Sequence, residues 1–170
     1  MNRYWIFATM FAGACVVAAQ DNPLSAELKR AHTTIKNYVV KSAEKMPEEN
    51  YSFKPTPEVR SFGQILGHVA DAEYFFCSTA KGESKQTDIE KTKTSKADLV
   101  AAIKEAYAYC DTAYDSLTDA KAMEILKASR GQRSRLSTLW TNTAHSDEHY
   151  GNLVTYMRIK GIVPPSSEGQ

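Results

Sequence analysis

The chain has 170 residues and a mass of 18.9 kDa, which suits one domain rather than two. Apolar residues make up 42% of it and charged residues 24%, so it does not have the composition of a disordered protein. The 21 basic and 20 acidic residues nearly cancel, which argues against a nucleic acid as partner. No internal repeat is evident, which argues against a solenoid.

The first residues predict a signal peptide. Arg3 gives a short positive start, residues 4–19 carry no charge, and Val17-Ala18-Ala19 provides the small side chains that precede a cleavage site. The uncharged run is shorter than the ~20 residues that a membrane-spanning helix needs. We therefore expect a cleaved signal peptide at residues 1–19 and an exported domain at residues 20–170, located in the periplasm or outside the cell.

Two alternatives would keep the domain at a membrane. The segment Ala12-Gly13-Ala14-Cys15 resembles a lipoprotein cleavage site, although Ala12 stands where a larger aliphatic residue is expected. A retained N-terminal helix would also act as an anchor. A membrane is therefore a partner only if this segment is lipidated or retained.

Apolar residues recur at helical spacing over four long segments after Pro23. Pro47 ends the first segment, Ser61 is a candidate N-cap for the second, and Gly161 ends the fourth. No segment shows strand periodicity over a useful length. We therefore predict an all-α four-helix bundle, with helices that cover about residues 24–46, 61–80, 96–117 and 135–160.

The connectors between the helices indicate the topology. The polar connector at residues 81–95 is long enough to run back along a helix, which allows the second and third helices to lie parallel, in an up-down-down-up bundle. The connector at residues 118–134 is expected to hold one short turn around residues 123–126. Cys77 and Cys110 would lie at similar heights in parallel helices. An oxidising compartment permits a disulfide between them without demanding it, and the alternative is two free thiols packed as small apolar side chains.

Three of the four histidines have the pattern of metal ligands. His145 and His149 lie one turn apart on the fourth predicted helix, and His68 lies on the inward side of the second. Three imidazoles from two helices would leave a position open on a bound ion, which is typical of catalytic rather than structural zinc. The alternatives are a chance pair on an amphipathic helix and, for His68, a hydrogen-bonded core residue. His32 has no partner at metal-binding spacing, and we interpret it as a surface or core residue.

Polar residues near these histidines are candidates for orienting them. Asp71 lies one turn beyond His68, Glu148 lies between the two histidines of the fourth helix, and Asn152 lies beside them on the helical wheel. A carboxylate or amide at such positions can orient an imidazole or accept a proton. For each residue the alternative is an ordinary solvated position on a helix.

Two stretches of the chain resemble a known family. The run from Phe62 to His68, followed by Ala70-Asp71-Ala72-Glu73, resembles the second-helix signature of the DinB-like (damage-inducible) family. The run from His145 to Leu153, with Tyr156-Met157-Arg158 and residues 161–165 after it, is similar to its fourth-helix signature. The resemblance extends over nearly the whole chain after the predicted signal peptide.

This resemblance implies a four-helix bundle, frequently a homodimer, that binds a divalent metal ion, usually zinc or nickel, through His68, His145 and His149. Relatives include S-transferases that use low-molecular-weight thiols and a maleylpyruvate isomerase. Asn152 departs from the glutamine that is common at its position, and an exported copy would lie outside the reducing compartment that holds such thiols. We therefore expect a metal-dependent enzyme on a small substrate, a hydrolase more than a thiol S-transferase. The alternative is a non-catalytic exported stress protein that binds metal or a partner.

Overall fold

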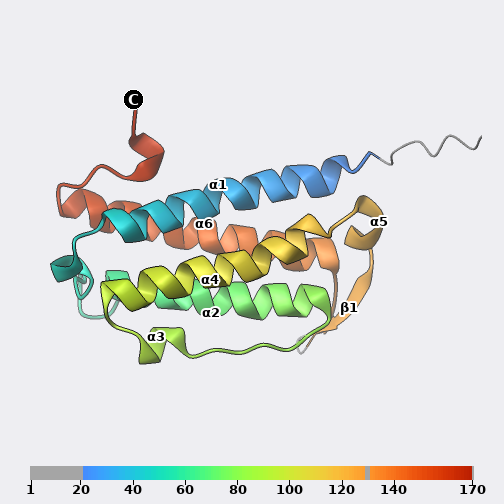
Figure 1. Ribbon diagram of the computed structural model, residues 1–170, viewed down its shortest axis with the longest axis horizontal. Helices are drawn as coiled ribbons and strands as arrows, with labels where there is room; N and C mark the ends of the chain where they lie inside the picture. The colour runs from blue at the N-terminus through green and yellow to red at the C-terminus, as the bar shows by residue number, and fades with distance from the viewer. Residues whose placement is uncertain (1–20, 129–130, 170) are drawn as a thin grey trace, which may run out of the picture.

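The computed structural model describes residues 21–128 and 131–169, so the predicted signal peptide and Cys15 lie outside the described residues. Four long helices dominate the described part, as Figure 1 shows, and the predicted all-α fold class is confirmed. Over these two ranges, no helix has both the length and the apolar character that crossing a membrane requires. The long helices are α1 (Pro23–Lys45), α2 (Phe62–Lys81), α4 (Lys96–Asp115) and α6 (Arg135–Ile159).

Local side-chain chemistry determines where α2 begins and ends. Ser61 and Gln64 form a reciprocal capping box, in which each side chain accepts a hydrogen bond from the backbone N–H of the other, at 3.2 and 2.9 Å. Gly82 ends the helix with a φ of 78°, a left-handed conformation that glycine adopts without a steric penalty. Both ends lie where the sequence predicts them.

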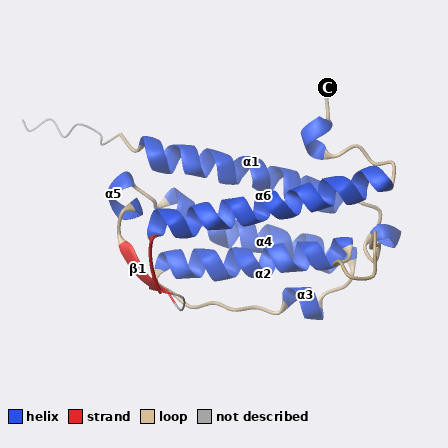
Figure 2. Cartoon of the chain, turned by 180° about the vertical axis from the view of Figure 1, so that it is seen from behind, coloured by secondary structure: helices blue, strands red, loops and turns tan. Residues whose placement is uncertain are grey.

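Helices α2 and α4 run in the same direction. A Cβ on Gly63, at the start of α2, would lie 3.1 Å from Leu99 near the start of α4, and a disulfide joins Cys77 to Cys110 towards their other ends. Helices α1 and α6 run the opposite way, as Figure 1 and the reverse view in Figure 2 show. The connector between α2 and α4 therefore runs back along the bundle, and it carries the short helix α3 (Ile89–Thr92).

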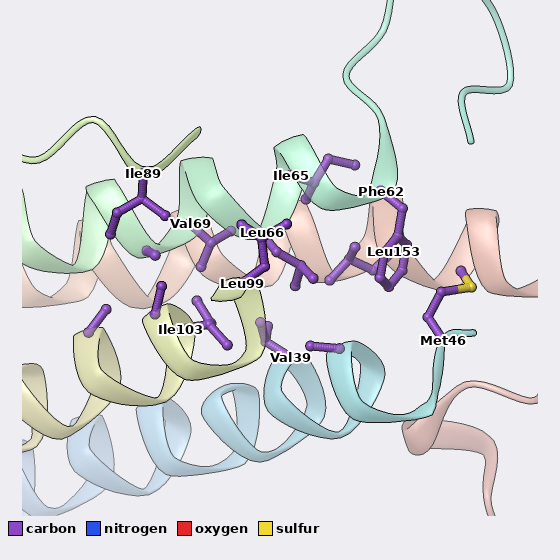
Figure 3. Close-up of a cluster of buried hydrophobic side chains, with 14 of the residues drawn as sticks. Val39, Met46, Phe62, Ile65, Leu66, Val69, Ile89, Leu99, Ile103 and Leu153 are labelled. Atoms are coloured by element: carbon purple, nitrogen blue, oxygen red, sulfur yellow. The ribbon is translucent and has the colours of Figure 1, made fainter. Parts of the chain in front are cut away.

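The apolar side chains meet in the centre of the bundle, where Figure 3 shows them. Phe62, Leu66 and Val69 from α2 are fully buried, and Ile103 from α4 is fully buried opposite them. Ile89 of α3 is only 7% exposed and joins the same cluster, so the connector is packed onto the bundle. Complete burial of such a side chain contributes roughly 1.5–3 kcal/mol.

The connector before α6 differs from the prediction in two ways. The short helix in it, α5, covers Asp119–Ala122 rather than residues 123–126, because Thr118 caps it by accepting a hydrogen bond from Lys121 N at 3.2 Å. Two short antiparallel strands follow, β1 (Ile125–Ala128) and β2 (Gly131–Ser134). Strands of four residues are too short to show a convincing period of two, which is why the sequence did not indicate them. The remaining elements are the 3-10 helices η1 (Glu48–Asn50) and η2 (Pro165–Ser167).

Candidate metal centre

His68, His145 and His149 meet at the interface of α2 and α6. The Nε2 atom of His145 lies 3.1 Å from Nε2 of His68 and 3.2 Å from Nε2 of His149. The three ligand atoms all lie within 4.8 Å of one another. Helix periodicity aligns the two histidines of α6, and antiparallel packing of α2 brings His68 across to them.

The distances between these nitrogen atoms fit a shared metal ion. Ligand nitrogens about 2.0–2.1 Å from a tetrahedral zinc ion lie about 3.3 Å from each other, close to the two contacts observed. Hydrogen bonding explains the arrangement less well. A ring nitrogen of a neutral imidazole either donates one hydrogen bond or accepts one in its plane, whereas Nε2 of His145 faces two other ring nitrogens. The donor set also suits nickel and other divalent ions that favour imidazole.

The surroundings keep these imidazoles neutral, which is the state that binds metal. Burial, followed by the charge of His68, lowers the pKa of His145 to about 4, and burial lowers the pKa of His149 to about 4 as well. Burial also lowers the pKa of His68, and the nearby Arg60 adds to the effect. Nδ1 of His145 is buried without a hydrogen-bond partner within the described ranges.

Glu90 contacts His68, although no pattern in the sequence indicated a role for this residue. Its Oε2 lies 3.2 Å from Nδ1 of His68, and its Oε1 accepts a hydrogen bond from Nε of Arg60 at 2.9 Å. A carboxylate on Nδ1 leaves Nε2 free to bind a metal and fixes the ring orientation. Glu90 belongs to α3 in the long connector, so only the tertiary packing brings it to the histidine.

Asp71 supports this arrangement indirectly. Its carboxylate accepts hydrogen bonds from Thr87 Oγ1 at 2.6 Å and from the backbone N–H groups of Ile89 and Glu90 at 2.8 and 3.0 Å. Asp71 therefore anchors the connector to α2. Its carboxylate bonds to the connector, whereas its position in the sequence suggested that it would orient an imidazole directly. Gly67 allows the same approach, because a Cβ there would lie 2.6 Å from the Cα of Glu90.

The other two candidates lie on the α6 side. Nδ2 of Asn152 is 3.3 Å from Nδ1 of His149, within reach of a hydrogen bond to that ring. Glu148 lines a hollow of about 650 Å³ together with His149, Asn152 and Arg60. The negative charge of Glu148 partly opposes the lowering of the pKa of His145.

A buried polar layer lies directly beneath the histidines. Glu73 is fully buried on α2, and its carboxyl group accepts hydrogen bonds from Asn142 Nδ2 at 3.0 Å and Ser146 Oγ at 2.8 Å. Burial raises the pKa of Glu73 to about 8. Because Asn142 and Ser146 belong to α6, and Ser146 is adjacent to His145, this layer sets the rotation of α6 against α2.

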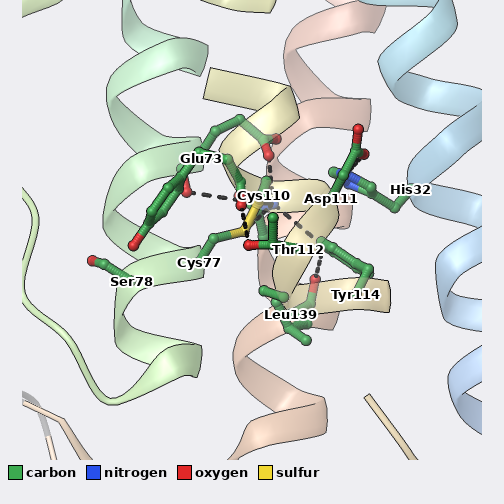
Figure 4. The surroundings of a disulfide bond; sticks show 12 residues. His32, Glu73, Cys77, Ser78, Cys110, Asp111, Thr112, Tyr114 and Leu139 are labelled. Carbon is green, nitrogen blue, oxygen red and sulfur yellow. Dashed lines mark hydrogen bonds and ion pairs between the residues drawn. A yellow bond between two sulfur atoms is a disulfide. The ribbon is translucent and has the colours of Figure 1, made fainter. Parts of the chain in front are cut away.

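The disulfide and His32 complete this layer, as Figure 4 shows. Cys77 and Cys110 are bonded across α2 and α4, with their Cα atoms 5.3 Å apart, so the structure has the disulfide that the sequence left open. His32 is a core residue whose ring stacks on that of Tyr114, with the two ring centroids 3.8 Å apart. His32, Glu73 and Cys110 also approach within 4.8 Å, but a disulfide-bonded sulfur offers no thiolate to a metal ion.

Comparison with known proteins supports the interpretation of the fold. The family model described as the DinB superfamily matches residues 32–153, which include all three histidines of the site. A DinB-like protein from Bacillus cereus ATCC 10987 is 17% identical, with a TM-score of 0.72 over 82% of this chain and 95% of its own. A DinB-like protein from Bacillus subtilis is 21% identical, with a TM-score of 0.66, and the similarity covers 79% of this chain and 92% of that protein.

A mycothiol-dependent maleylpyruvate isomerase also has this fold. It is 15% identical, with a TM-score of 0.60, and the similarity covers 76% of this chain and 60% of the isomerase. A search of curated proteins finds no match. At these levels of identity, the similarity to solved structures concerns the fold.

Proposed function

This chain belongs to the DinB superfamily, and we propose that it is an exported metal-dependent enzyme that acts on a small substrate. Its three ligands are His68, His145 and His149, and zinc or nickel is the proposed ion. The observation that carries the proposal is the approach of three neutral Nε2 atoms to 3.1 and 3.2 Å at one point beside an open hollow.

A divalent ion held there would supply Lewis acidity to a carbonyl group, a thiol or water. The protein's own side chains hold and orient the ligands: Glu90 accepts from Nδ1 of His68, and Asn152 lies against Nδ1 of His149. Neutral imidazoles leave most of the charge of the ion uncompensated, which strengthens its effect on a bound group. The hollow beside His149 provides room for a small molecule.

Two reaction types fit this site, and we favour hydrolysis over transfer to a thiol. Export would place the protein away from low-molecular-weight thiols, and the disulfide between Cys77 and Cys110 suits an oxidising compartment. The fold shared with a mycothiol-dependent isomerase keeps thiol transfer as the second reaction to test.

Metal analysis tests the site directly. The chain from residue 20 onward, purified without chelators or a histidine tag, should hold about one ion per chain by inductively coupled plasma mass spectrometry. The His145→Ala/His149→Ala variant should hold little, whereas Asp147→Ala, an exposed change on the same helix turn, should retain the parent content. Equal metal content in parent and double variant would refute the site.

Activity separates an enzyme from a binding protein. We expect metal-dependent turnover of a model ester or a thiol acceptor by the loaded parent, and loss of that turnover in His149→Ala. Stoichiometric metal binding without turnover across both substrate classes would instead identify a metal-binding protein without catalysis.

A further inference from the structure

The three histidines line two separate hollows at the interface of α2 and α6. On one side is the hollow of about 650 Å³ that contains His149. On the other side is a hollow of about 350 Å³ that contains His68 and His145. A molecule bound at the histidines can therefore extend into either hollow.

The two hollows differ in chemistry. The larger hollow is lined by charged side chains of both signs, among them Lys54, Arg60, Glu58 and Glu148, and by the amide of Asn152. The smaller hollow is lined by Ala72, Phe75 and Phe76 beside the two histidines. We refer to them as the polar hollow and the phenylalanine hollow.

The phenylalanine hollow offers an aromatic surface beside the metal ligands. Phe75 is 41% exposed although it is a large apolar residue, and its ring packs edge to face on Phe76 at 5.2 Å. The ring of Phe76 lies 6.0 Å from the ring of His145. Aromatic pairs favour this edge-to-face geometry, and a third ring can extend the cluster.

Besides the two histidines, the polar residues of the phenylalanine hollow are Asp71, Gln86 and Thr87, and two of these, Asp71 and Thr87, are hydrogen-bonded to each other. Asp71 accepts three hydrogen bonds from residues 87–90, including one from Thr87, which also lines the hollow. Among the described residues, no lysine or arginine lines this hollow. A charged substrate group is therefore disfavoured there, whereas the polar hollow offers cationic and acidic side chains and the amide of Asn152 to a polar group.

From this asymmetry we infer the substrate class, an inference that rests on the proposed function. The site takes small amphipathic molecules whose reactive group lies at the three histidines. An aromatic or other compact apolar group lies over Phe75 and Phe76, and the polar end lies in the polar hollow.

Two metal-binding probes of different apolar size test this inference without relying on turnover. Cobalt-loaded protein, followed by its visible absorption, is titrated with benzohydroxamate and with acetohydroxamate, which share the same chelating group. We expect benzohydroxamate to bind about 10-fold more tightly, because its ring removes apolar surface from water. Phe75→Ser, an exposed change, should reduce that preference, and Phe75→Ser/Phe76→Ser should abolish it.

Trp140→Ser is the matched control, since Trp140 is an exposed aromatic residue on α6 that lines neither hollow. It should keep the full preference for benzohydroxamate. Equal affinity for the two probes in the parent, or an unchanged preference in the phenylalanine variants, would overturn the inference and leave the metal site intact.

Two further outcomes are distinguishable from these. Absence of a cobalt spectrum and of binding of both probes would refute the proposed function, and this inference with it. Conversion of a dimer to a monomer by Phe75→Ser in analytical ultracentrifugation, with the probe preference unchanged, would show that a second copy of the chain covers the phenylalanines, and would overturn the inference.

Discussion

Helix α2 makes two very different interfaces, with α4 on one side and α6 on the other. Towards α4 the contacts are apolar and covalent, with fully buried Ile103 and the disulfide between Cys77 and Cys110. Towards α6 an apolar set that includes Leu153 is accompanied by a polar set, which extends from Glu73 to the three histidines. The comparison indicates that α4 holds α2 in place, while the interface with α6 contains the candidate metal ligands.

The polar part of this interface is stabilised by the hydrogen bonds of its buried carboxyl group, Glu73. A buried polar group without a partner costs free energy, and Glu73 meets this requirement through Asn142 and Ser146. The Nε2 atoms of the three histidines converge on one another instead. Four variants test this division, in order of decreasing expected effect.

Removing the disulfide should affect the stability of the fold and leave the site in place. For a sequence separation of 33 residues, the entropy of loop closure predicts that Cys77→Ala/Cys110→Ala loses about 3–4 kcal/mol of unfolding free energy. Urea unfolding measures the loss, and metal content measured well below the unfolding midpoint should remain at the parent level. Loss of metal without loss of stability would reverse the roles assigned to the two interfaces.

Glu73 should make stability fall as pH rises. Its pKa is about 8 in the folded chain and 4.5 for the same group exposed to water, so between these values the folded state retains a proton that the unfolded state has lost. Unfolding then becomes easier with rising pH, by at most about 1.4 kcal/mol per pH unit. Glu73→Gln removes this dependence.

The effect of Glu73 is measured as the difference in unfolding free energy between the parent and Glu73→Gln. Urea unfolding of the metal-free parent and of metal-free Glu73→Gln at about pH 5.5 and about pH 8 gives the unfolding free energy of each. We expect the value for the variant minus that for the parent to be roughly 3 kcal/mol larger at the higher pH. Burial lowers the pKa of His32 to about 4, so both proteins lose stability as the pH falls below 6.5, the pKa of His32 in the unfolded chain. Because this loss is the same in parent and variant, it cancels in the difference. A pH-independent difference would contradict the protonated state of Glu73.

Glu90 should influence metal affinity more than stability. Removing its charge in Glu90→Gln weakens the hold on Nδ1 of His68, and loss of such a carboxylate typically costs 10–100-fold in metal affinity. Competition with a chromogenic chelator measures the affinity. An unchanged dissociation constant would show that the position of Glu90 has no role in the site.

Gly67→Ala should give a smaller loss through the same contact, about 10-fold or less. The new Cβ must displace the backbone at Glu90, which moves the carboxylate away from His68. Since both changes act on one contact, combining Gly67→Ala with Glu90→Gln should cost little more than Glu90→Gln alone. Additive losses in the same chelator competition would show that Gly67 acts elsewhere.

Much of this molecule follows from local sequence patterns. Apolar spacing and caps such as Ser61 and Gly82 predicted the four long helices, and the spacing of His145 and His149 predicted that they share a face. Such patterns predict structure because residues three or four positions apart in the sequence lie on the same face of a helix. The connector before α6 was predicted less well, because α5 and the two short strands are held by single caps and by pairing with each other.

The sequence by itself therefore determined the fold class, the helices and the three histidines that point to a metal. Only the tertiary structure decided that Glu90 contacts His68, that Asp71 anchors the connector, and that Glu73 fastens α6 through Asn142 and Ser146. These contacts join residues far apart in the chain, and their partners follow from how the connector packs on the bundle. Periodicity along one helix carries no information about that packing.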